Sequence, residues 1–244
     1  MKKILKKLLI YIRNIALTLI FLSLFFVVLY KYVPVYYTPL MFIRSVEQIM
    51  DEKKVKIEHQ WVPLSEMSQH LVQAVVASED NLFLVHNGFD FEQIEIAREQ
   101  AGKGQKLRGA STISQQTAKN VFLWPGRSFV RKGLEAYYTL LIEFIWGKER
   151  IMEVYLNSIE MGDGIYGAEA VAKSHFNKHA KKLTAKEAAL IAASLPNPIN
   201  FNSSKPSAYM IKRQAKIISL MDKIIQVNFD KPDVKKKDKS AKKK

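Results

Sequence analysis

The segment Arg108-Gly-Ala-Ser-Thr-Ile-Ser-Gln-Gln-Thr-Ala-Lys-Asn120 decides the fold, because almost all of its side chains are polar. From Ser111 to Asn120, only Ile113 and Ala118 are apolar. Buried hydroxyls and amides are costly when they lack partners, so the sequence predicts that this run lies at the surface. Gly109 before Ser111 indicates a loop that turns into a helix, with Ser111 as its N-cap.

Cations near this predicted helix start favour an anion site. The first turn of a helix offers unpaired N–H groups and the positive end of its dipole to a phosphate. Lysine and arginine side chains add charge-assisted hydrogen bonds to phosphate oxygens, and the nearby cations are Lys119, Arg127, Arg131 and Lys132. Taken alone, the segment also fits a second interpretation, in which it is a capped, solvated helix start that binds no ligand.

The composition narrows the class of protein. A chain of 244 residues with 48% hydrophobic residues is long and apolar enough to fold around a core, as one large or two small domains. The chain has no cysteine, which excludes disulfides, thiolate chemistry and cysteine-ligated zinc. A net charge of +15 implies an anionic partner, such as nucleic acid, lipid head groups or a phosphorylated substrate.

The N-terminal residues are typical of a membrane anchor. Residues 1–7 are rich in lysine, and residues 8–30 are almost wholly apolar, which as a helix spans about 35 Å. No small-residue cleavage site follows, and nearby tyrosines resemble an interfacial belt. We predict a basic cytoplasmic tail at 1–7, an uncleaved single-pass signal anchor at 8–30, and the rest of the chain outside the cytoplasm. A buried core helix is the alternative.

Beyond the anchor, the sequence predicts a mostly α-helical, single-domain protein without solenoid repeats. We assign residues 31–54 to a juxtamembrane linker, 55–228 to the folded domain and 229–244 to a disordered lysine-rich tail. One short strand is expected within 55–62 and a mobile flap at 92–107. Helices are expected from Ser65 to Ser78, and at 128–146, 148–157, 168–176, 184–196 and 207–225. Apolar residues around the circumference of the helix at 128–146 predict that it is largely buried.

Two acids stand out by their positions. Glu79 ends a predicted apolar helix, where a general base could act, although a solvated helix-end acid is the simpler interpretation. Glu135 follows Arg131 and Lys132 at helical spacing, which also fits an ordinary ion pair worth about 0.2–0.5 kcal/mol. Glycosyl transfer commonly uses a pair of carboxylates around the anomeric carbon. A diphosphate leaving group would add a need for cations and for a divalent metal.

Five segments in order resemble the motifs of the peptidoglycan glycosyltransferases, glycosyltransferase family 51. The first is Glu79-Asp-Asn-Leu-Phe83 with His86, Gly88 and Asp90. The second is Gly109 to Asn120, in which Ala110 and Ser114 replace the more usual glycine and threonine. The others are Arg131-Lys-Gly-Leu-Glu135, Glu149 to Asn157 with Gly162 and Gly167, and Thr184 to Pro198. The resemblance covers about residues 60–225.

This resemblance implies a bilobal, lysozyme-like helical fold and the polymerisation of lipid II into glycan strands. Glu79 would be the base that deprotonates the 4-hydroxyl of the incoming GlcNAc. That oxygen would attack C1 of MurNAc in the growing strand and expel undecaprenyl diphosphate, with inversion. The motifs of a transpeptidase domain are absent from the sequence, so a monofunctional enzyme is expected.

The resemblance also assigns roles to other residues. Donor contacts to the diphosphate and sugars fall on Ser111, Gln116, Lys119, Arg127 and Lys132. Glu135 matches a second acid that assists the leaving diphosphate directly or through Mg²⁺ or Mn²⁺, and no organic cofactor is implied. Architectural positions are Asp80, His86, Asp90 and Asn120. Residues expected to reach the membrane face are Phe122, Leu123, Trp124 and Phe129.

The expected partners are lipid II, the growing lipid-linked strand, the membrane, and cell-wall synthesis or division proteins. The expected location is a bacterial inner membrane, with the catalytic domain in the periplasm, where nucleic acid is not a partner. Two other functions compete with polymerisation. One is a lysozyme-like enzyme that cleaves glycan, and the other is a non-catalytic, membrane-anchored module that binds an anionic polymer.

Overall fold

The computed structural model describes residues 2–102, 109, 111–126 and 128–229, and within them the fold is mostly helical, as predicted. The chain divides into two compact units, residues 1–34 and residues 35–244. The first unit is formed by α1 (Lys2–Tyr32), a helix long and apolar enough to cross a membrane. Arg127, a predicted donor contact, lies outside the described residues, and so does the predicted disordered tail at 229–244 apart from residue 229.

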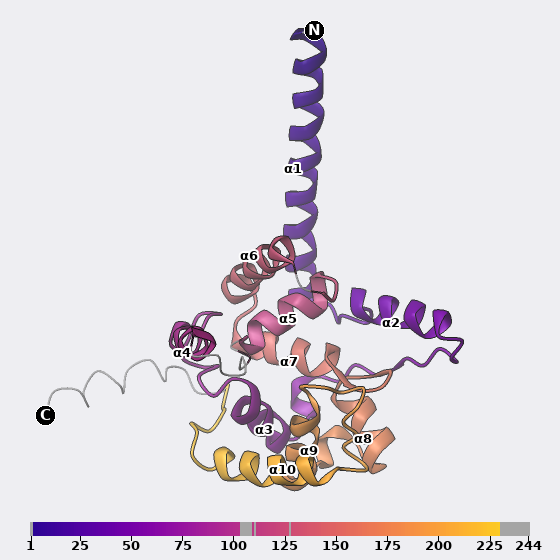
Figure 1. The fold of residues 1–244 in the computed structure, drawn as a ribbon, viewed down its shortest axis with the longest axis vertical. Helices are drawn as coiled ribbons and strands as arrows, with labels where there is room; N and C mark the ends of the chain where they lie inside the picture. Colours follow the sequence, from indigo (N-terminus) through magenta and orange to yellow (C-terminus); the bar gives the residue numbers. More distant parts are fainter. Residues whose placement is uncertain (1, 103–108, 110, 127, 230–244) are drawn as a thin grey trace, which may run out of the picture. The chain divides into compact units, whose positions relative to one another are not determined.

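The second unit contains two groups of helices (Figure 1). In one group α3 (Gln69–Glu79), α9 (Ala185–Ser194) and α10 (Ala208–Met221) pack against one another. In the other, α5 (Ile113–Phe122) packs on α6 (Phe129–Ile145) and on α7 (Lys148–Ser158). Helix α7 also contacts α8 (Ala168–Phe176), and α2 (Pro39–Met50) contacts α5. Helix α3 therefore brings its last residue, Glu79, from the first group toward the second.

A small sheet joins the N-terminal part of the second unit to its centre. Its strands are β1 (Glu58–His59), β2 (Glu160–Gly162) and β3 (Ile165–Tyr166), in the order β1-β3-β2. Strand β1 runs parallel to β3, which confirms the predicted strand within 55–62, and β2 runs antiparallel to β3. Gly164 is required at the turn, because it has φ +66° and a Cβ there would lie 2.4 Å from the Lys56 carbonyl oxygen.

Side-chain capping sets the starts of several helices, and two predicted caps were wrong. Thr184 forms the predicted capping box with Glu187 at the start of α9. The start of α5 is capped by Thr112 and not by Ser111, because Thr112 and Gln115 form a second capping box and Ser111 is exposed. Helix α3 is capped by Ser68 and not by Ser65, which lies in the short 3-10 helix η1 (Leu64–Glu66).

Two segments that were predicted to lack regular structure contain helices. The predicted linker at 31–54 includes α2, which begins after Thr38, whose hydroxyl accepts the Met41 N–H. The predicted flap at 92–107 is largely α4 (Phe91–Gly102), and its remaining residues, 103–107, lie outside the described part of the chain. Both helices are short and follow a residue that caps them, Thr38 and Asp90, which is the local signal for a helix.

Helix α6 was predicted to be largely buried, and the structure corrects this. Its buried residues are Arg131, Glu135, Thr139 and Ile142, which follow one another at helical spacing. Exposed apolar residues lie on the other side, where Phe129 is 98% exposed and Phe144 is 91% exposed. The helix thus turns its mainly polar stripe toward the protein and its apolar side away from it.

Candidate functional site

Helix α5 lies at the centre of the candidate site, and its polar residues are buried. We predicted this run to be a surface, but Ser114, Gln115 and Thr117 are almost inaccessible. The Ser114 hydroxyl donates to Glu143 Oε1 at 2.5 Å, and the Thr117 hydroxyl donates to the Ile113 carbonyl at 2.8 Å. Because these polar groups have partners, burying them does not leave the desolvation penalty uncompensated.

Glu79 is held at the end of α3 by donors on both carboxylate oxygens. The Ser78 hydroxyl donates to Oε1 at 3.0 Å, and Gln116 Nε2 on α5 donates to Oε2 at 3.3 Å. The Tyr155 hydroxyl on α7 donates to Gln116 Oε1 at 3.2 Å, which fixes which end of the amide faces Glu79. Burial raises the pKa of the Tyr155 phenol well above its ordinary value, so this donor keeps its proton.

Arg213 is a residue of this site that the sequence did not reveal. It comes from α10 and belongs to none of the five quoted motifs. Its Nη2 donates to the Ser78 hydroxyl at 3.1 Å and lies 3.6 Å from Glu79 Oε1. The neighbouring Lys212 and Lys216 carry the same charge on the same helix, so nothing in the sequence distinguishes Arg213. Only the packing of α10 on α3 does so.

Asp80 connects the loop after α3 to the first turn of α5. Its Oδ2 accepts the Ile113 N–H at 2.9 Å, and its Oδ1 lies 2.9 Å from His86 Nε2. His86 Nδ1 accepts the Gly88 N–H at 3.1 Å, so the imidazole proton is on Nε2 and is donated to Asp80. The N–H groups we expected to bind phosphate are thus partly used by Asp80 and by the Thr112 capping box, which argues against an anion at this helix end.

Two other predicted architectural residues have simpler surroundings. Asp90 is buried, and its Oδ1 accepts the Gln93 N–H at 2.9 Å at the start of α4. Asn120 is buried within α5. The Thr112 hydroxyl donates to the Gly88 carbonyl at 2.6 Å, so the loop between α3 and α4 is attached to the start of α5 at two points.

Glu135 on α6 lies among cations. Its Oε2 is 2.7 Å from Arg131 Nη1, and its Oε1 is 2.5 Å from Lys132 Nζ. Glu135 and Arg131 are buried, so this is not a solvent-exposed helical ion pair. Burial lowers the pKa of Lys119 on α5, with Glu135 acting to raise it and Arg131 and Lys132 acting to lower it further. Three cations around one carboxylate leave a net positive charge.

The residues around Glu135 do not fit a divalent metal held by the protein. Both of its carboxylate oxygens already contact cations. In the part of the chain that the structure describes, no three histidine, aspartate or glutamate side chains are grouped as ligands of one ion. Magnesium and manganese prefer several oxygen ligands. The donor set at Glu135 therefore does not support the expected Mg²⁺ or Mn²⁺ site.

The four residues expected at the membrane face divide into two pairs. Leu123 is 3% exposed, so that expectation was wrong for this residue, and Phe122 is half-buried and stacks on Tyr138 with ring centroids 4.5 Å apart. Trp124 and Phe129 are exposed. From the end of α5 to the start of α6, Phe122 and Leu123 therefore pack against the protein, and Trp124 and Phe129 are accessible.

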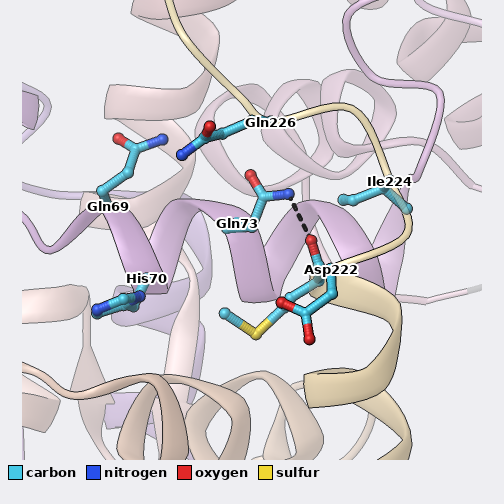
Figure 2. A pocket seen from close by; sticks show the side chains of 7 residues that line it. Gln69, His70, Gln73, Asp222, Ile224 and Gln226 are labelled. Atoms are coloured by element: carbon cyan, nitrogen blue, oxygen red, sulfur yellow. Dashed lines mark hydrogen bonds between the residues drawn. The ribbon is translucent and has the colours of Figure 1, made fainter.

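A separate hollow of about 580 Å³ lies near the start of α3 (Figure 2). Its wall includes Gln69, Gln73 and Asp222, and Gln73 donates to the Met221 carbonyl at 3.0 Å. Gln73 also accepts the Val227 N–H at 2.9 Å. These groups hold the chain after α10 onto α3, so the hollow does not present a set of free polar groups for a ligand.

The geometry defines a class of protein before any comparison. One carboxylate, Glu79, is held by neutral donors and an arginine, one of the donors being Gln116 on α5. One turn further along α5, Lys119 is influenced by the charges of Arg131, Lys132 and Glu135. Such a site suits an enzyme that removes a proton from a neutral acceptor and stabilises an anionic leaving group. The chain also carries a helix that could anchor it in a membrane.

Comparisons with known proteins agree with this class. A protein-family model described as Transglycosylase matches residues 46–222. The chain is 56% identical over 240 residues to a biosynthetic peptidoglycan transglycosylase of Bacteroides thetaiotaomicron, covering 98% of this chain and 97% of that protein. It is 54% identical to the protein of the same name from Bdellovibrio bacteriovorus, over 81% of this chain and 79% of that one. The chain belongs to the transglycosylase family and is a glycosyltransferase, which confirms the predicted family.

Proposed function

We propose that this glycosyltransferase acts in peptidoglycan synthesis and polymerises lipid II. In this reaction, the glycan on an undecaprenyl-diphosphate donor passes to the 4-hydroxyl of the GlcNAc of another lipid II. The names of the relatives support peptidoglycan as the product. The observation that carries the proposal is that α5 connects the surroundings of both acids. Gln116 donates to Glu79, and Lys119, three residues later, feels the charge of Glu135.

Glu79 is the proposed general base. Its carboxylate takes the proton of the acceptor hydroxyl while that oxygen forms a bond to C1 of the donor sugar. The bond from C1 to the diphosphate oxygen breaks, its electron pair leaves with undecaprenyl diphosphate, and the configuration at C1 inverts. Contacts from Ser78, Gln116 and Arg213 keep the carboxylate in one orientation, which reduces the cost of reaching the transition state.

The cations on α5 and α6 are the proposed site of the leaving diphosphate. Lys119, Arg131 and Lys132 supply three positive charges, and Glu135 neutralises one of them and holds two in place. Charge that develops on the leaving oxygens is stabilised by these fixed cations. Ser111 is exposed just before α5 and is proposed to contact a donor sugar. Gln116 and Arg127 are proposed as further donor contacts. No step of this scheme uses a divalent cation.

The proposed setting is the inner membrane of a bacterium. Helix α1 would cross the bilayer once, with the basic residues 2–7 in the cytoplasm and the second unit in the periplasm. The exposed apolar side of α6, with Trp124 before it, would face the bilayer, where lipid-linked substrates arrive. This placement accounts for an apolar helix side that no other part of the described protein covers.

A product assay tests the proposed reaction. The purified full chain is incubated with labelled lipid II in detergent, and the products are separated by size. Polymerisation yields glycan longer than the disaccharide together with undecaprenyl diphosphate. Unchanged lipid II with clearing of preformed sacculi would instead identify a glycan-cleaving enzyme. If the protein shows neither of these activities, a non-catalytic binding role is what remains.

A further inference from the structure

Helix α2 presents a continuous apolar side that is exposed. Phe42, Ile49 and Met50 are 61%, 61% and 78% exposed, and Val46 between them is also exposed. The spacing of these four residues, at i, i+4, i+7 and i+8, places them on one side of the helix. Single exposed apolar residues are common on protein surfaces, but a continuous row indicates a surface that is covered in use.

The other side of α2 is fixed to the second unit. Met41 is fully buried, and Gln48 Oε1 accepts the Lys56 N–H at 2.8 Å. Arg44 Nε lies 3.4 Å from Glu160 Oε2 on β2, which anchors the helix to the small sheet. The direction in which the apolar row points is therefore set by contacts within this unit and does not depend on the position of α1.

The chain itself limits what can cover this row. Helix α1 ends at Tyr32 and α2 begins at Pro39, so seven Cα–Cα steps of at most ~3.6 Å keep the two ends within about 25 Å. Tyr36 and Tyr37 between them are exposed, and the Tyr37 ring lies 5.9 Å from the Phe42 ring. Tyrosines are enriched at the boundary between lipid and water.

We propose that α2 lies in the lipid–water interface of the bilayer, with Phe42, Val46, Ile49 and Met50 toward the acyl chains. The proposal rests on the α1 anchor of the proposed function, which brings the start of α2 close to the bilayer. An amphipathic helix in this position gives the second unit its own contact with lipid. Because α2 packs on α5, this contact would also set the orientation of the candidate site relative to the membrane.

The absence of cysteine from the chain allows a direct test. Single variants Ile49→Cys, Val46→Cys and Glu47→Cys are made in the full chain, labelled with an environment-sensitive fluorophore and reconstituted into phosphatidylethanolamine–phosphatidylglycerol vesicles. Glu47 is the matched control, because it is exposed on α2 outside the apolar row. Leu19→Cys reports on α1. The labels at Ile49, Val46 and Leu19 should show blue-shifted emission and a loss of fluorescence with nitroxide-labelled acyl chains, and the label at Glu47 should not.

The controls separate this inference from the proposed anchor. If Leu19 is quenched while Ile49 and Val46 behave like Glu47, the interface position of α2 is wrong and the anchor stands. If Leu19 is also unquenched, the anchor and the inference both fail. Blue-shifted emission at Ile49 and Val46 without quenching by lipid would show that protein, such as a second copy of the chain, covers the row, and this too would overturn the proposal.

Discussion

The orientation of Glu79 depends on side chains from three other helices. Gln116 from α5 and Arg213 from α10 contact its carboxylate, and Tyr155 from α7 fixes Gln116. Ser78 links Arg213 to the same carboxylate oxygen. A carboxylate held in this way accepts a proton along one direction, so we expect changes at these residues to act on the rate of the chemical step.

We predict that Arg213→Gln lowers kcat for lipid II polymerisation about 10- to 100-fold, with little change in KM. The reason is that a loosely held base departs from the geometry that the transition state needs. Lys216→Gln is the control, because Lys216 is exposed on the same helix and its substitution removes the same charge. Steady-state kinetics of both variants and the wild type measure the difference.

A second variant distinguishes positioning from substrate binding. Ser78→Ala removes the hydroxyl between Arg213 and Glu79, so the double variant should lose less than the product of the two single losses. The Arg213 side chain is only half-buried, so a direct contact of its guanidinium with substrate is the competing role. A raised KM with unchanged kcat in Arg213→Gln would support that role and contradict positioning.

The protonation of Lys119 should limit activity at alkaline pH. Burial lowers the pKa of Lys119, so its charge is lost at a lower pH than the ordinary lysine value of 10.5. As pH rises through this lowered pKa, the donor diphosphate loses a cation and KM should rise. In the variant Lys119→Arg the side chain stays charged over this whole pH range. Its KM should therefore rise only at a higher pH than that of the wild type, or not at all. Identical pH profiles for the two proteins would count against a diphosphate contact at Lys119.

At the scale of helices, some local signals were sufficient and others were misleading. The capping box at Thr184 was identified from its sequence pattern, and Thr112-Ile-Ser-Gln115 carries the same pattern, so the start of α5 could have been predicted. The burial of α5 could not, because it depends on partners such as Glu143, 29 residues away from Ser114. The apolar residues around α6 led to the wrong prediction that the protein buries this helix. The pattern shows that a helix is apolar, but it does not show whether the rest of the protein covers it.

We predict that Thr112→Ala lowers both stability and activity. The substitution removes the N-cap of α5, which costs about 0.5–2 kcal/mol, and the hydrogen bond to the Gly88 carbonyl. Thr184→Ala removes an equivalent cap from α9 in the other helix group, so it should lower Tm but leave kcat nearly unchanged. Thermal unfolding and the polymerisation assay are measured for both variants. If Thr112→Ala and Thr184→Ala have equal activities, the α5 cap has no particular role in the site.

Glu169 at the start of α8 should make stability depend on acid pH. Burial acts to raise the pKa of Glu169, but hydrogen bonds from the Ala180 N–H, at 2.8 Å, and from His179 lower it overall. This contribution to stability is present above the ordinary value of 4.5 and is lost as pH falls through the lowered folded-state pKa. The difference in unfolding free energy between wild type and Glu169→Gln should therefore shrink below about pH 4.5. A difference that stays constant in urea titrations from pH 7 downward would oppose this assignment.

At the scale of the whole molecule, the resemblance to known motifs singled out Glu79, Glu135 and Lys119 from sequence. The structure places Gln116 beside Glu79, and Arg131 and Lys132 beside Glu135, while the roles of these residues stay predictions. The second unit was harder to delimit. Residues 39–50 were assigned to a linker, yet they form α2 and pack on α5, because twelve residues after a membrane anchor carry little information about their tertiary partners.

The exposed aromatic residues near α6 should matter more in a bilayer than in detergent. We predict that Trp124→Glu lowers polymerisation in lipid vesicles more strongly than in detergent micelles, since a charge at the lipid boundary disfavours the working orientation. Tyr209→Glu is the control, because Tyr209 is a similarly exposed aromatic residue on α10. Equal losses for the two variants, or none for Trp124→Glu, would remove the membrane role of this side of the protein.

The most direct test of the account compares lipid II polymerisation by the wild type, Glu79→Gln and Glu135→Gln. Loss of a general base typically lowers the rate about 10²–10⁴-fold, and we expect this loss for Glu79→Gln with the fold intact by circular dichroism. Glu135→Gln should also lose activity, because Arg131 and Lys132 would lose the carboxylate that orients them. If Glu79→Gln synthesised glycan at the rate of the wild type, this would contradict the central claim that Glu79 removes the acceptor proton.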